Sequence, residues 1–252
     1  MKPVLFNTPM VQALLNTKPG TWPAEPIDPS RPFKSQTRRA VEDPPCRLEA
    51  SSRYRYDGIC NEPDSDDDGC HYMEELTSDG EPTERYLNIG KAPYQVGDRL
   101  WVRETFQAWG YWFEYWDVAK NKTRKKFIDL TDGTHPYLYD GGFVKPPAKA
   151  MTCDVMGYWK RPSIYMPRKV ARLFLEVKAV RVEQLRRISL EDCVSEGAVK
   201  KPHYIKWGGE KCLSIHGRYK KDFSELWNSI NGKGAWESNP WVWVYEYMRV
   251  EG

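Results

Sequence analysis

The chain has 252 residues, with 38 Lys and Arg against 35 Asp and Glu, which gives a net charge of +3. No run of apolar residues approaches the roughly 18 that a membrane-spanning helix needs, and the opening MKPVLFNTPM lacks the apolar core of a signal peptide. Six scattered cysteines favour a reduced, cytoplasmic protein over a disulfide scaffold. We therefore expect a cytoplasmic protein and exclude secretion and a membrane partner.

The near-balance of charge hides two parts of opposite sign. Eleven acids and no Lys or Arg lie between Asp57 and Glu84. Removing this −11 from the net +3 leaves +14 for the remaining residues. A basic body suggests a polyanionic partner, and the acidic segment 57–84 is a candidate for docking a protein partner or for mimicking nucleic acid.

The first elements are a strand, a helix and a loop. Residues 3–16 (PVLFNTPMVQALLN) are typical of a short strand that runs into an amphipathic helix. Five prolines within 18–33 exclude a helix interior and predict a loop. This loop leads to the basic stretch 34–39 (KSQTRR).

Two later segments are predicted as insertions. Residues 46–92 show little apolar periodicity and include the acidic run, so we expect an acidic insertion or flexible lobe there. Residues 107–160 are rich in Trp, Tyr and Gly and include the basic cluster Lys120 to Lys126, which predicts an aromatic and basic insertion of strands and long loops.

The remaining elements follow in order. A strand is predicted at 100–105, after a turn at 96–99, and alternation of apolar and polar residues predicts strands at 172–182 and 239–250. A helix is expected from Ser189 to Gly197, a polar, basic loop over about 199–218, and a second short helix over 223–230. The whole predicts one α+β domain over 1–252, a small β-barrel with flanking helices and long loop insertions.

Seven segments in a fixed order resemble the ASCH domain family of the PUA-like superfamily, and specifically its phage and prophage branch. They are PVLFNTPMVQALLN at the start, KSQTRR at 34–39, VGDRLWVRET at 96–105, KRPSIYMPR at 160–168, RLFLEVKAVRVEQL at 172–185, ISLEDCVSEGA at 188–198, and FSELWNSI with NPWVWVYEY near the C-terminus. The resemblance implies a PUA-like barrel with a cleft suited to a nucleobase or RNA. If the chain is phage-encoded, its site of action is the host cytoplasm.

The resemblance also implies a reaction. Some small bacterial members of the family are amidohydrolases that remove the acetyl group from N4-acetylcytidine, using a Lys, a Thr three residues later and a Glu in a later helix. The family pattern K-x-x-T-x-R falls on Lys34, Thr37 and Arg39, and the helix Glu falls on Glu196. This chain departs from the family upstream, where the Pro-rich stretch 18–33 replaces a short Gly-Arg or Gly-Lys turn.

The residue types suit acyl transfer, which needs a nucleophile, a base and a proton donor for the leaving amine. Thr37 is the candidate nucleophile, and Lys34 is the candidate base if burial or a nearby cation lowers its pKa. Glu196 would hold the ammonium and pass a proton to the leaving nitrogen. Arg38 and Arg39 are candidates for binding a phosphate or an oxyanion. The alternative is a solvated basic loop at 34–39.

Other polar residues are candidates for binding substrate or nucleic acid. Glu104 follows a predicted strand and is either a pocket carboxylate or the partner of Arg103 or Arg99 in an edge-strand ion pair. Arg161 and Arg168 flank PSIYMP, which is either a phosphate-binding loop or a basic surface loop.

The eleven tryptophans divide into two groups. Trp101, Trp159, Trp241 and Trp243 lie in or beside strands, which favours core packing over base stacking. Trp109, Trp112 and Trp116 alternate with tyrosines and are followed by KNKTRKK, which favours a surface that stacks on bases and contacts phosphates.

No metal or other cofactor is predicted. A Cys₃His zinc site from Cys46, Cys60, Cys70 and His71 is the alternative. The spacing lacks a CxxC pair, which favours free thiols.

Three functions remain open. The first is an amidohydrolase that acts on N4-acylated cytidine, as a free nucleoside or within RNA or DNA. The second is a module that binds RNA, DNA or a modified base without chemistry. The third is a phage accessory protein whose acidic segment docks a host protein or mimics nucleic acid.

Overall fold

The computed structural model describes residues 1–28, 31, 33–41, 54–60, 69–147, 155–198, 204–207, 210–213 and 218–252. The chain divides into two compact units. Unit 1 comprises Met1–Lys2, Gln12–Leu100 and Leu173–Gly252, and unit 2 comprises Pro3–Val11 and Trp101–Arg172. None of the described helices is both long enough and apolar enough to cross a bilayer.

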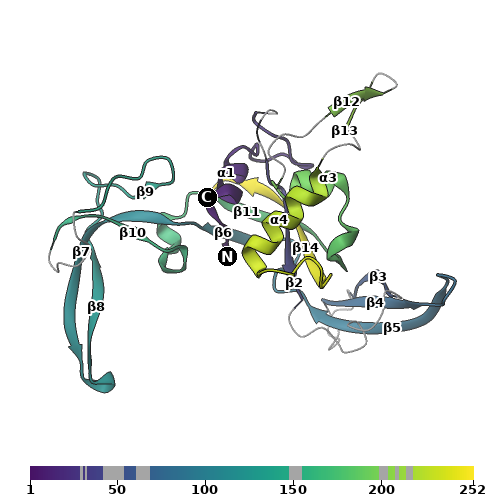
Figure 1. Cartoon of the computed structure of the whole chain (residues 1–252), viewed down its shortest axis with the longest axis horizontal. Coiled ribbons are helices and arrows are strands. Elements are labelled where there is room, and N and C mark those ends of the chain that lie inside the picture. Colours follow the sequence, from purple (N-terminus) through teal and green to yellow (C-terminus); the bar gives the residue numbers. More distant parts are fainter. Residues whose placement is uncertain are drawn as a thin grey trace. The chain divides into compact units, whose positions relative to one another are not determined.

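The secondary structure is dominated by strands (Figure 1). The α-helices are α1 (Thr8–Leu15), α3 (Leu190–Ser195) and α4 (Tyr219–Asn231). The strands are β1 (Lys2–Leu5), β2 (Gln36–Ala40), β3 (Tyr54–Ile59), β4 (Cys70–Leu76), β5 (Pro82–Lys91), β6 (Arg99–Arg103), β7 (Phe106–Asp117), β8 (Lys122–Asp129), β9 (Leu138–Tyr139), β10 (Gly157–Arg161), β11 (Phe174–Gln184), β12 (Tyr204–Trp207), β13 (Glu210–Leu213) and β14 (Trp241–Val250). Short 3₁₀ turns are η1 (Val118–Lys120), η2 (Ser163–Tyr165), η3 (Arg168–Val170) and η4 (Leu185–Arg187).

The α+β class is confirmed, with sheet as the main component. The described strands form a five-stranded sheet in the order β1-β6-β11-β14-β2, a sheet with β10-β7-β8 and β9, a three-stranded sheet β3-β4-β5, and the pair β12-β13. These sheets are open, so the strand pairings of the described residues do not close a barrel.

The strand pair β11–β14 is the longest antiparallel ladder of unit 1. It runs from Phe174 opposite Val250 to Gln184 opposite Trp241, with a register shift between Val177 and Ala179. On its other side β14 pairs with β2, and Tyr245 lies opposite Thr37. The predicted strands at 172–182 and 239–250 are confirmed. They could be predicted because alternation of apolar and polar residues is a local pattern.

Helix α3 begins and ends where the sequence predicts. The Ser189 hydroxyl accepts the N–H of Asp192 (3.0 Å) as an N-cap. Gly197 follows the helix with φ of +70°, a conformation that favours glycine.

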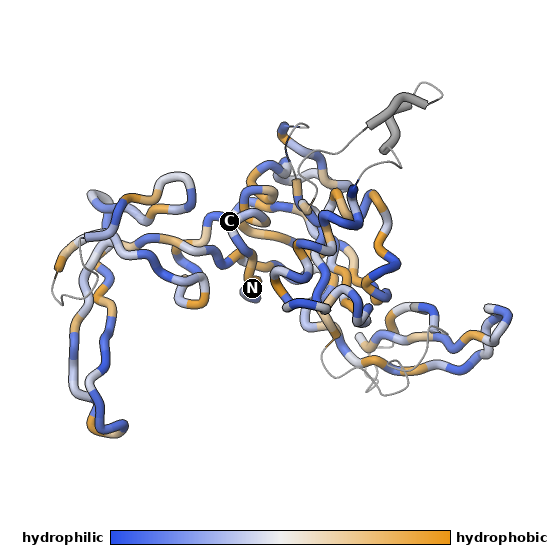
Figure 2. The backbone as a smooth tube through the Cα atoms, viewed as in Figure 1, coloured by the Kyte–Doolittle hydropathy of each residue, from blue (hydrophilic) through white to orange (hydrophobic). Residues whose placement is uncertain are grey.

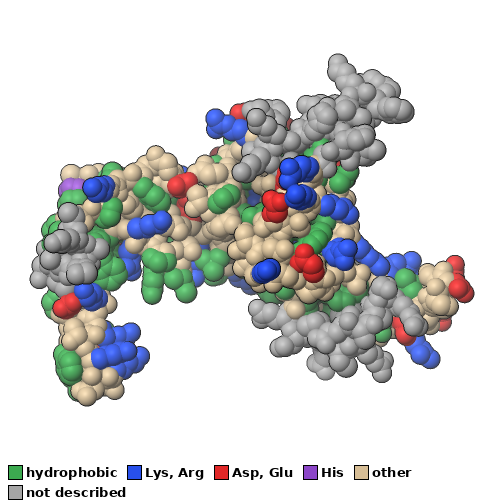
Figure 3. All heavy atoms as spheres, viewed as in Figure 1, with side chains coloured by type: hydrophobic (Ala, Val, Ile, Leu, Met, Phe, Trp, Pro, Cys, Tyr) green, Lys and Arg blue, Asp and Glu red, His purple; other side chains and the backbone are tan. Residues whose placement is uncertain are grey.

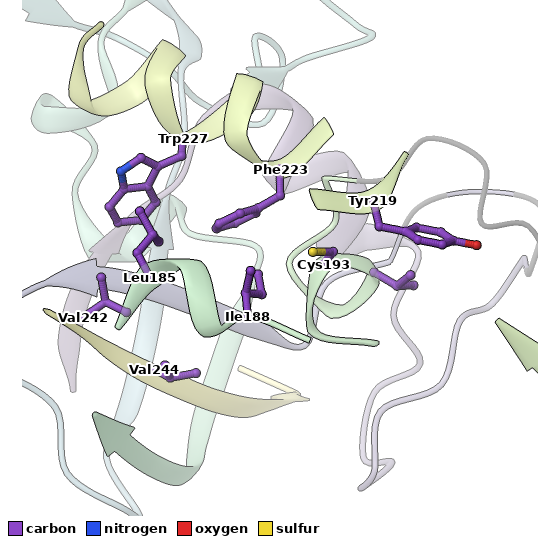
Figure 4. Close-up of a cluster of buried hydrophobic side chains, with 9 residues drawn as sticks. Leu185, Ile188, Cys193, Tyr219, Phe223, Trp227, Val242 and Val244 are labelled. Atoms are coloured by element: carbon purple, nitrogen blue, oxygen red, sulfur yellow. The ribbon is translucent and has the colours of Figure 1, made fainter. Parts of the chain in front are cut away.

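One face of the β11–β14–β2 sheet is covered by α3 and α4 (Figure 4). The cluster there consists of buried residues from the sheet, η4 and both helices: Leu185, Ile188, Cys193, Val194, Tyr219, Phe223, Trp227, Val242 and Val244. In Figure 2 apolar stretches of backbone gather in the same region. Burying side chains of this size contributes roughly 1.5–3 kcal/mol each, so this cluster fixes both helices on the sheet.

The acidic segment contains more regular structure than the sequence indicates. Where we expected an insertion or flexible lobe, β3, β4 and β5 form an antiparallel sheet. Its β5 strand is mostly exposed, which explains why apolar periodicity is weak there. Unit 2 contains the predicted strands of the aromatic insertion, and the two strand residues Trp101 and Trp159 are buried as expected.

Of the four residues of the alternative zinc site, Cys46 lies outside the described residues. Cys60 and Cys70 face each other across a hairpin, where the Cys60 N–H donates to the Cys70 carbonyl (2.9 Å). His71 packs with its ring edge on Trp243, 4.8 Å between centroids. Within the described ranges, no three His, Cys, Asp or Glu side chains form a metal-binding group.

Burial of His71 predicts an acid-sensitive fold. Its side chain is 1 % exposed, and burial lowers its pKa from 6.5 to about 4. Between these two values the unfolded chain binds a proton that the folded chain does not, so the free energy of unfolding falls as pH decreases from 6.5 to 4. Urea titrations across this range should show a shallower pH slope in His71→Gln than in the wild type. The control His135→Gln, at a partly exposed loop residue, should keep the slope, and equal slopes in all three proteins would contradict this account.

Candidate functional site

The candidate site lies in unit 1, at the open edge of β2. The Pro-rich loop delivers the chain to Lys34, and β2 begins two residues later. Ser35 donates its N–H to the carbonyl of Ser195 (2.9 Å). This bond joins the end of α3 to the beginning of β2 and so brings Glu196 beside Lys34.

Lys34 is completely buried, with 0 % exposure. Its ammonium donates to the carbonyl of Gln36 (2.7 Å), to the carbonyl of Glu196 (2.8 Å) and to Glu196 Oε2 (2.9 Å). A Lys ammonium has three N–H donors, and these three acceptors satisfy them. The sequence alternative of a solvated basic loop therefore does not describe Lys34.

Glu196 divides its carboxylate between two cations. The side chain is 2 % exposed. Oε2 accepts from Lys34, while Oε1 accepts from Arg38 Nη1 (2.9 Å). The two charge-assisted bonds hold both carboxylate oxygens in fixed positions.

The Arg38 guanidinium also donates hydrogen bonds to two other carboxylates. Nε and Nη2 donate to Glu183 Oε1 (3.0 and 2.5 Å), and Nη2 donates to Asp192 Oδ2 (2.7 Å). Its side chain is 0 % exposed. The structure therefore places the buried Arg38 guanidinium against three carboxylates, an environment that does not fit the expected role in binding a phosphate.

The network extends along the sheet. Arg181 Nη2 donates to Asp192 Oδ2 (3.1 Å), and Arg181 also bonds Glu246. With its amide oriented to satisfy both neighbours, Gln36 donates to Asp192 Oδ1 (2.9 Å) and accepts from Arg181 Nη2 (2.8 Å). We call the set Lys34, Gln36, Arg38, Arg181, Glu183, Asp192, Glu196 and Glu246 the carboxylate network.

Burial and the neighbouring carboxylates shift the pKa values of the cations in this network in opposite directions. Burial lowers the pKa of Lys34, and this outweighs the attraction of Glu196, which raises it, while Arg39 and Arg38 lower it further. Burial alone would lower the pKa of Arg38, but Glu196, Glu183 and Asp192 together raise it. The pKa of Lys34 is thus lowered, whereas the pKa of Arg38 is raised, so the two buried cations of this network are shifted in opposite directions.

Thr37 and Arg39 belong to the other face of β2, because successive side chains of a strand alternate. Thr37 is 4 % exposed and lies opposite Tyr245, whereas Arg39 is half-buried. The Tyr247 hydroxyl donates to the Gln36 carbonyl (3.3 Å), the same oxygen that accepts from Lys34. The Gln36 carbonyl therefore links Lys34, a member of the carboxylate network, to the sheet face that carries Thr37, Arg39, Tyr245 and Tyr247.

The remaining candidates belong to unit 2. Glu104 is buried and forms a two-point ion pair with Arg172 (2.8 Å for each bond), where we expected Arg103 or Arg99 as its partner. Arg161 lies over the rings of Trp112, Phe127 and Tyr165 at 4.9, 4.6 and 5.0 Å. Trp109 stacks on His135 with centroids 4.1 Å apart. Arg168 is exposed in η3.

Sequence reasoning missed five members of the carboxylate network, Gln36, Arg181, Glu183, Asp192 and Glu246, and it also missed Tyr247 beside them. Glu183 and Tyr247 lie on strands, and the alternation pattern predicts which face of a strand a residue lies on but not which residue it contacts. The one available signal was the surplus of charged residues on a predicted strand, Arg181 and Glu183 in KAVRVEQL.

No family model, no curated protein and no solved structure matches this chain.

The Lys34–Glu196 pair can be tested by a double-mutant cycle. Removing one partner of a buried ion pair costs roughly 3–5 kcal/mol, since a charge is left without compensation. Lys34→Met and Glu196→Gln should each lower the free energy of unfolding by about this amount, and the double variant should lose less than the sum. The exposed pair Lys18–Glu25 (2.6 Å) is the control, where Lys18→Met and Glu25→Gln should cost roughly 0–1 kcal/mol. Additive losses at Lys34 and Glu196 would disprove the coupling.

Close packing around Gly197, the residue that follows Glu196, leads to a second prediction about stability. A Cβ at Gly197 would lie 2.9 Å from the Ala13 Cβ and 3.4 Å from the Lys34 Cβ, and φ is +70°. Gly20 has nearly the same φ, +72°, with nothing within 4 Å of such a Cβ. Gly20→Ala should therefore cost about 1–2 kcal/mol for its backbone alone, and Gly197→Ala roughly 1–3 kcal/mol more for overpacking. Equal losses in denaturant titrations would contradict the packing around Gly197.

Proposed function

We propose that the protein is an ASCH-type amidohydrolase that removes an N4-acyl group from cytidine or a related modified nucleoside. In this proposal the fold is the small PUA-like barrel of that family, enlarged by insertions. The observation that carries the proposal is the buried pair of Lys34 and Glu196, joined by a 2.9 Å hydrogen bond, in which burial lowers the pKa of the lysine.

A single proton shift prepares this pair for acid–base chemistry. Transfer of a proton from the Lys34 ammonium to Glu196 Oε2 converts the ion pair into a neutral amine and a carboxylic acid. A buried environment reduces the free-energy difference between the ion pair and the neutral pair, because burial disfavours both charges of the ion pair. The neutral amine can then take a proton, and the acid can donate one, as catalysis near neutral pH requires.

The proposed reaction proceeds through an acyl-enzyme. Thr37 Oγ attacks the acyl carbon as its proton passes to Lys34, and Glu196 donates its proton to N4 as the C–N4 bond breaks. Water then attacks the threonyl ester, loses its proton to Glu196, and releases the acid as Lys34 returns a proton to Thr37. Arg39, half-buried on the Thr37 face, is the proposed cation for the oxyanion, since Arg38 is held by three carboxylates.

The energetic cost of the carboxylate network supports a functional role. Buried ion pairs are often no more stabilising than apolar residues of similar volume. Two fully buried cations at Lys34 and Arg38 are therefore hard to explain by stability alone. Groups with a perturbed pKa that occur together in this way are typical of active sites.

The test is incubation of the protein with N4-acetylcytidine while acetate release is measured. Wild type should turn over, and Lys34→Met, Thr37→Val and Glu196→Gln should each lower kcat/KM by roughly 10²- to 10⁴-fold, the usual contribution of such groups. Ser35→Ala, within the same motif, is the matched control and should keep activity within a few-fold. Circular dichroism would confirm that each variant is folded.

Two outcomes would redirect the proposal. Full activity in Thr37→Val would remove Thr37 as the nucleophile and leave water as the attacking group. Absence of turnover by the folded wild type, together with salt-sensitive binding of RNA or DNA, would favour the non-catalytic binding module.

A further inference from the structure

The β7–β8 hairpin of unit 2 is a two-stranded ribbon over most of its length (Figure 1). Strands β10 and β9 pair with β7 only between Phe106 and Gly110. From Tyr111 to Asp117, β7 pairs with β8 and with no other described strand. Isolated two-stranded ribbons are marginally stable in water, so the exposed aromatic side chains of this one need an explanation beyond folding.

The register sorts the ribbon's side chains onto two unlike faces. Phe113 lies opposite Lys126, Tyr115 opposite Arg124, and Asp117 opposite Lys122. Paired residues share a face, so one face has a column of aromatic rings on β7 beside a column of cations on β8. We call Phe113, Tyr115, Lys122, Arg124 and Lys126 the cation–aromatic face.

This face is open to solvent. Phe113 is 46 % and Tyr115 37 % exposed, and all three cations are exposed. Successive cations are separated by roughly 6.8 Å, two residues of an antiparallel strand. Figure 3 shows Lys and Arg side chains gathered along one side of the ribbon.

Its charge is only partly neutralised. Asp117 accepts from Arg124 (3.1 Å) and also from the N–H of Lys120. Lys122 and Lys126 form no ion pair with any part of the chain that the structure describes. On the opposite face, Glu114 and Lys125 neutralise each other at 3.0 Å, so the excess of positive charge is confined to one side.

The base of the ribbon is rigidified from the opposite face. Trp112 and Phe127 are a cross-strand pair with ring centroids 5.4 Å apart. Arg161 lies over both rings. This packing occupies the Trp112 face at its base and leaves the cation–aromatic face uncovered.

We infer that the cation–aromatic face of the β7–β8 ribbon binds single-stranded nucleic acid. A nucleotide carries a flat base beside a charged phosphate, which is the complement of a ring column beside a cation column. Bases of a single strand are free to stack on Phe113 and Tyr115, whereas a duplex buries the faces of its bases. The inference depends on the ribbon alone and is independent of the proposed hydrolysis.

The test is fluorescence anisotropy with oligouridylate and oligothymidylate of about a dozen nucleotides, within the usual site sizes, at several salt concentrations. Wild type should bind with a negative slope of log K against log salt. The triple variant Lys122→Ser, Arg124→Ser, Lys126→Ser should flatten this slope by about 2, since each phosphate contact of a single strand contributes about 0.7.

A second variant separates stacking from charge. Phe113→Ser with Tyr115→Ser should weaken binding by roughly 5- to 150-fold for each stacked base and leave the salt slope unchanged. Lys125→Ser, a cation of the same strand on the opposite face, is the matched control and should change little. The ratio of affinities for the two oligonucleotides then shows whether RNA or DNA is preferred.

Several results would overturn the inference. These are absence of binding by wild type, an unchanged slope in the triple variant, an equal loss in Lys125→Ser, or tighter binding of duplex than of single strand. The assay involves no hydrolysis, so failure to turn over N4-acetylcytidine would leave a positive binding result intact, and the reverse also holds.

Discussion

Two buried cations, Arg38 in β2 and Lys34 two residues before the strand begins, constrain the architecture of unit 1. Lys34 and Arg38 are each 0 % exposed, and neither charge is tolerable in a protein interior without a carboxylate in contact. The carboxylates come from distant parts of the sequence, with Glu196 at the end of α3 and Glu183 on β11. Helix α3, β2 and β11 must therefore assemble together, because burial of Lys34 and Arg38 without the carboxylates of α3 and β11 would leave their charges uncompensated.

The apolar core strengthens this arrangement. Arg38 lies 5.9 Å from the centroid of Phe223 in α4, so the hydrophobic cluster closes over the guanidinium. Water is thereby kept from the ion pairs, and Coulomb attraction is larger in such an environment than at a surface. The same exclusion of water lowers the pKa of Lys34, so the feature that strengthens the ion pairs also favours the role as a base that we propose for this lysine.

Local patterns were enough to predict much of the fold and part of the site. The cap at Ser189, the glycine at Gly197 and the alternation of β14 are encoded by neighbouring residues. Lys34 and Glu196 were proposed together only through a family resemblance, because 162 residues separate them. The partner of Glu104 was misjudged since Arg172 is 68 residues away, and cross-strand register of this kind leaves no local trace. In the acidic segment, β5 was missed because a mostly exposed strand shows little apolar alternation, and β4 was missed because its buried positions include polar residues such as His71 and Glu74.

The hydrogen bond from Ser35 to the Ser195 carbonyl has a kinetic consequence. Lys34 is sealed while this bond and the last turn of α3 remain closed, so solvent or a ligand touches its amine only during local opening. The Ser35 amide proton becomes exchangeable in the same event. Under conditions where every opening leads to exchange, its exchange rate with deuterium equals the opening rate, and that rate sets an upper limit on every process in which a molecule from solution contacts Lys34.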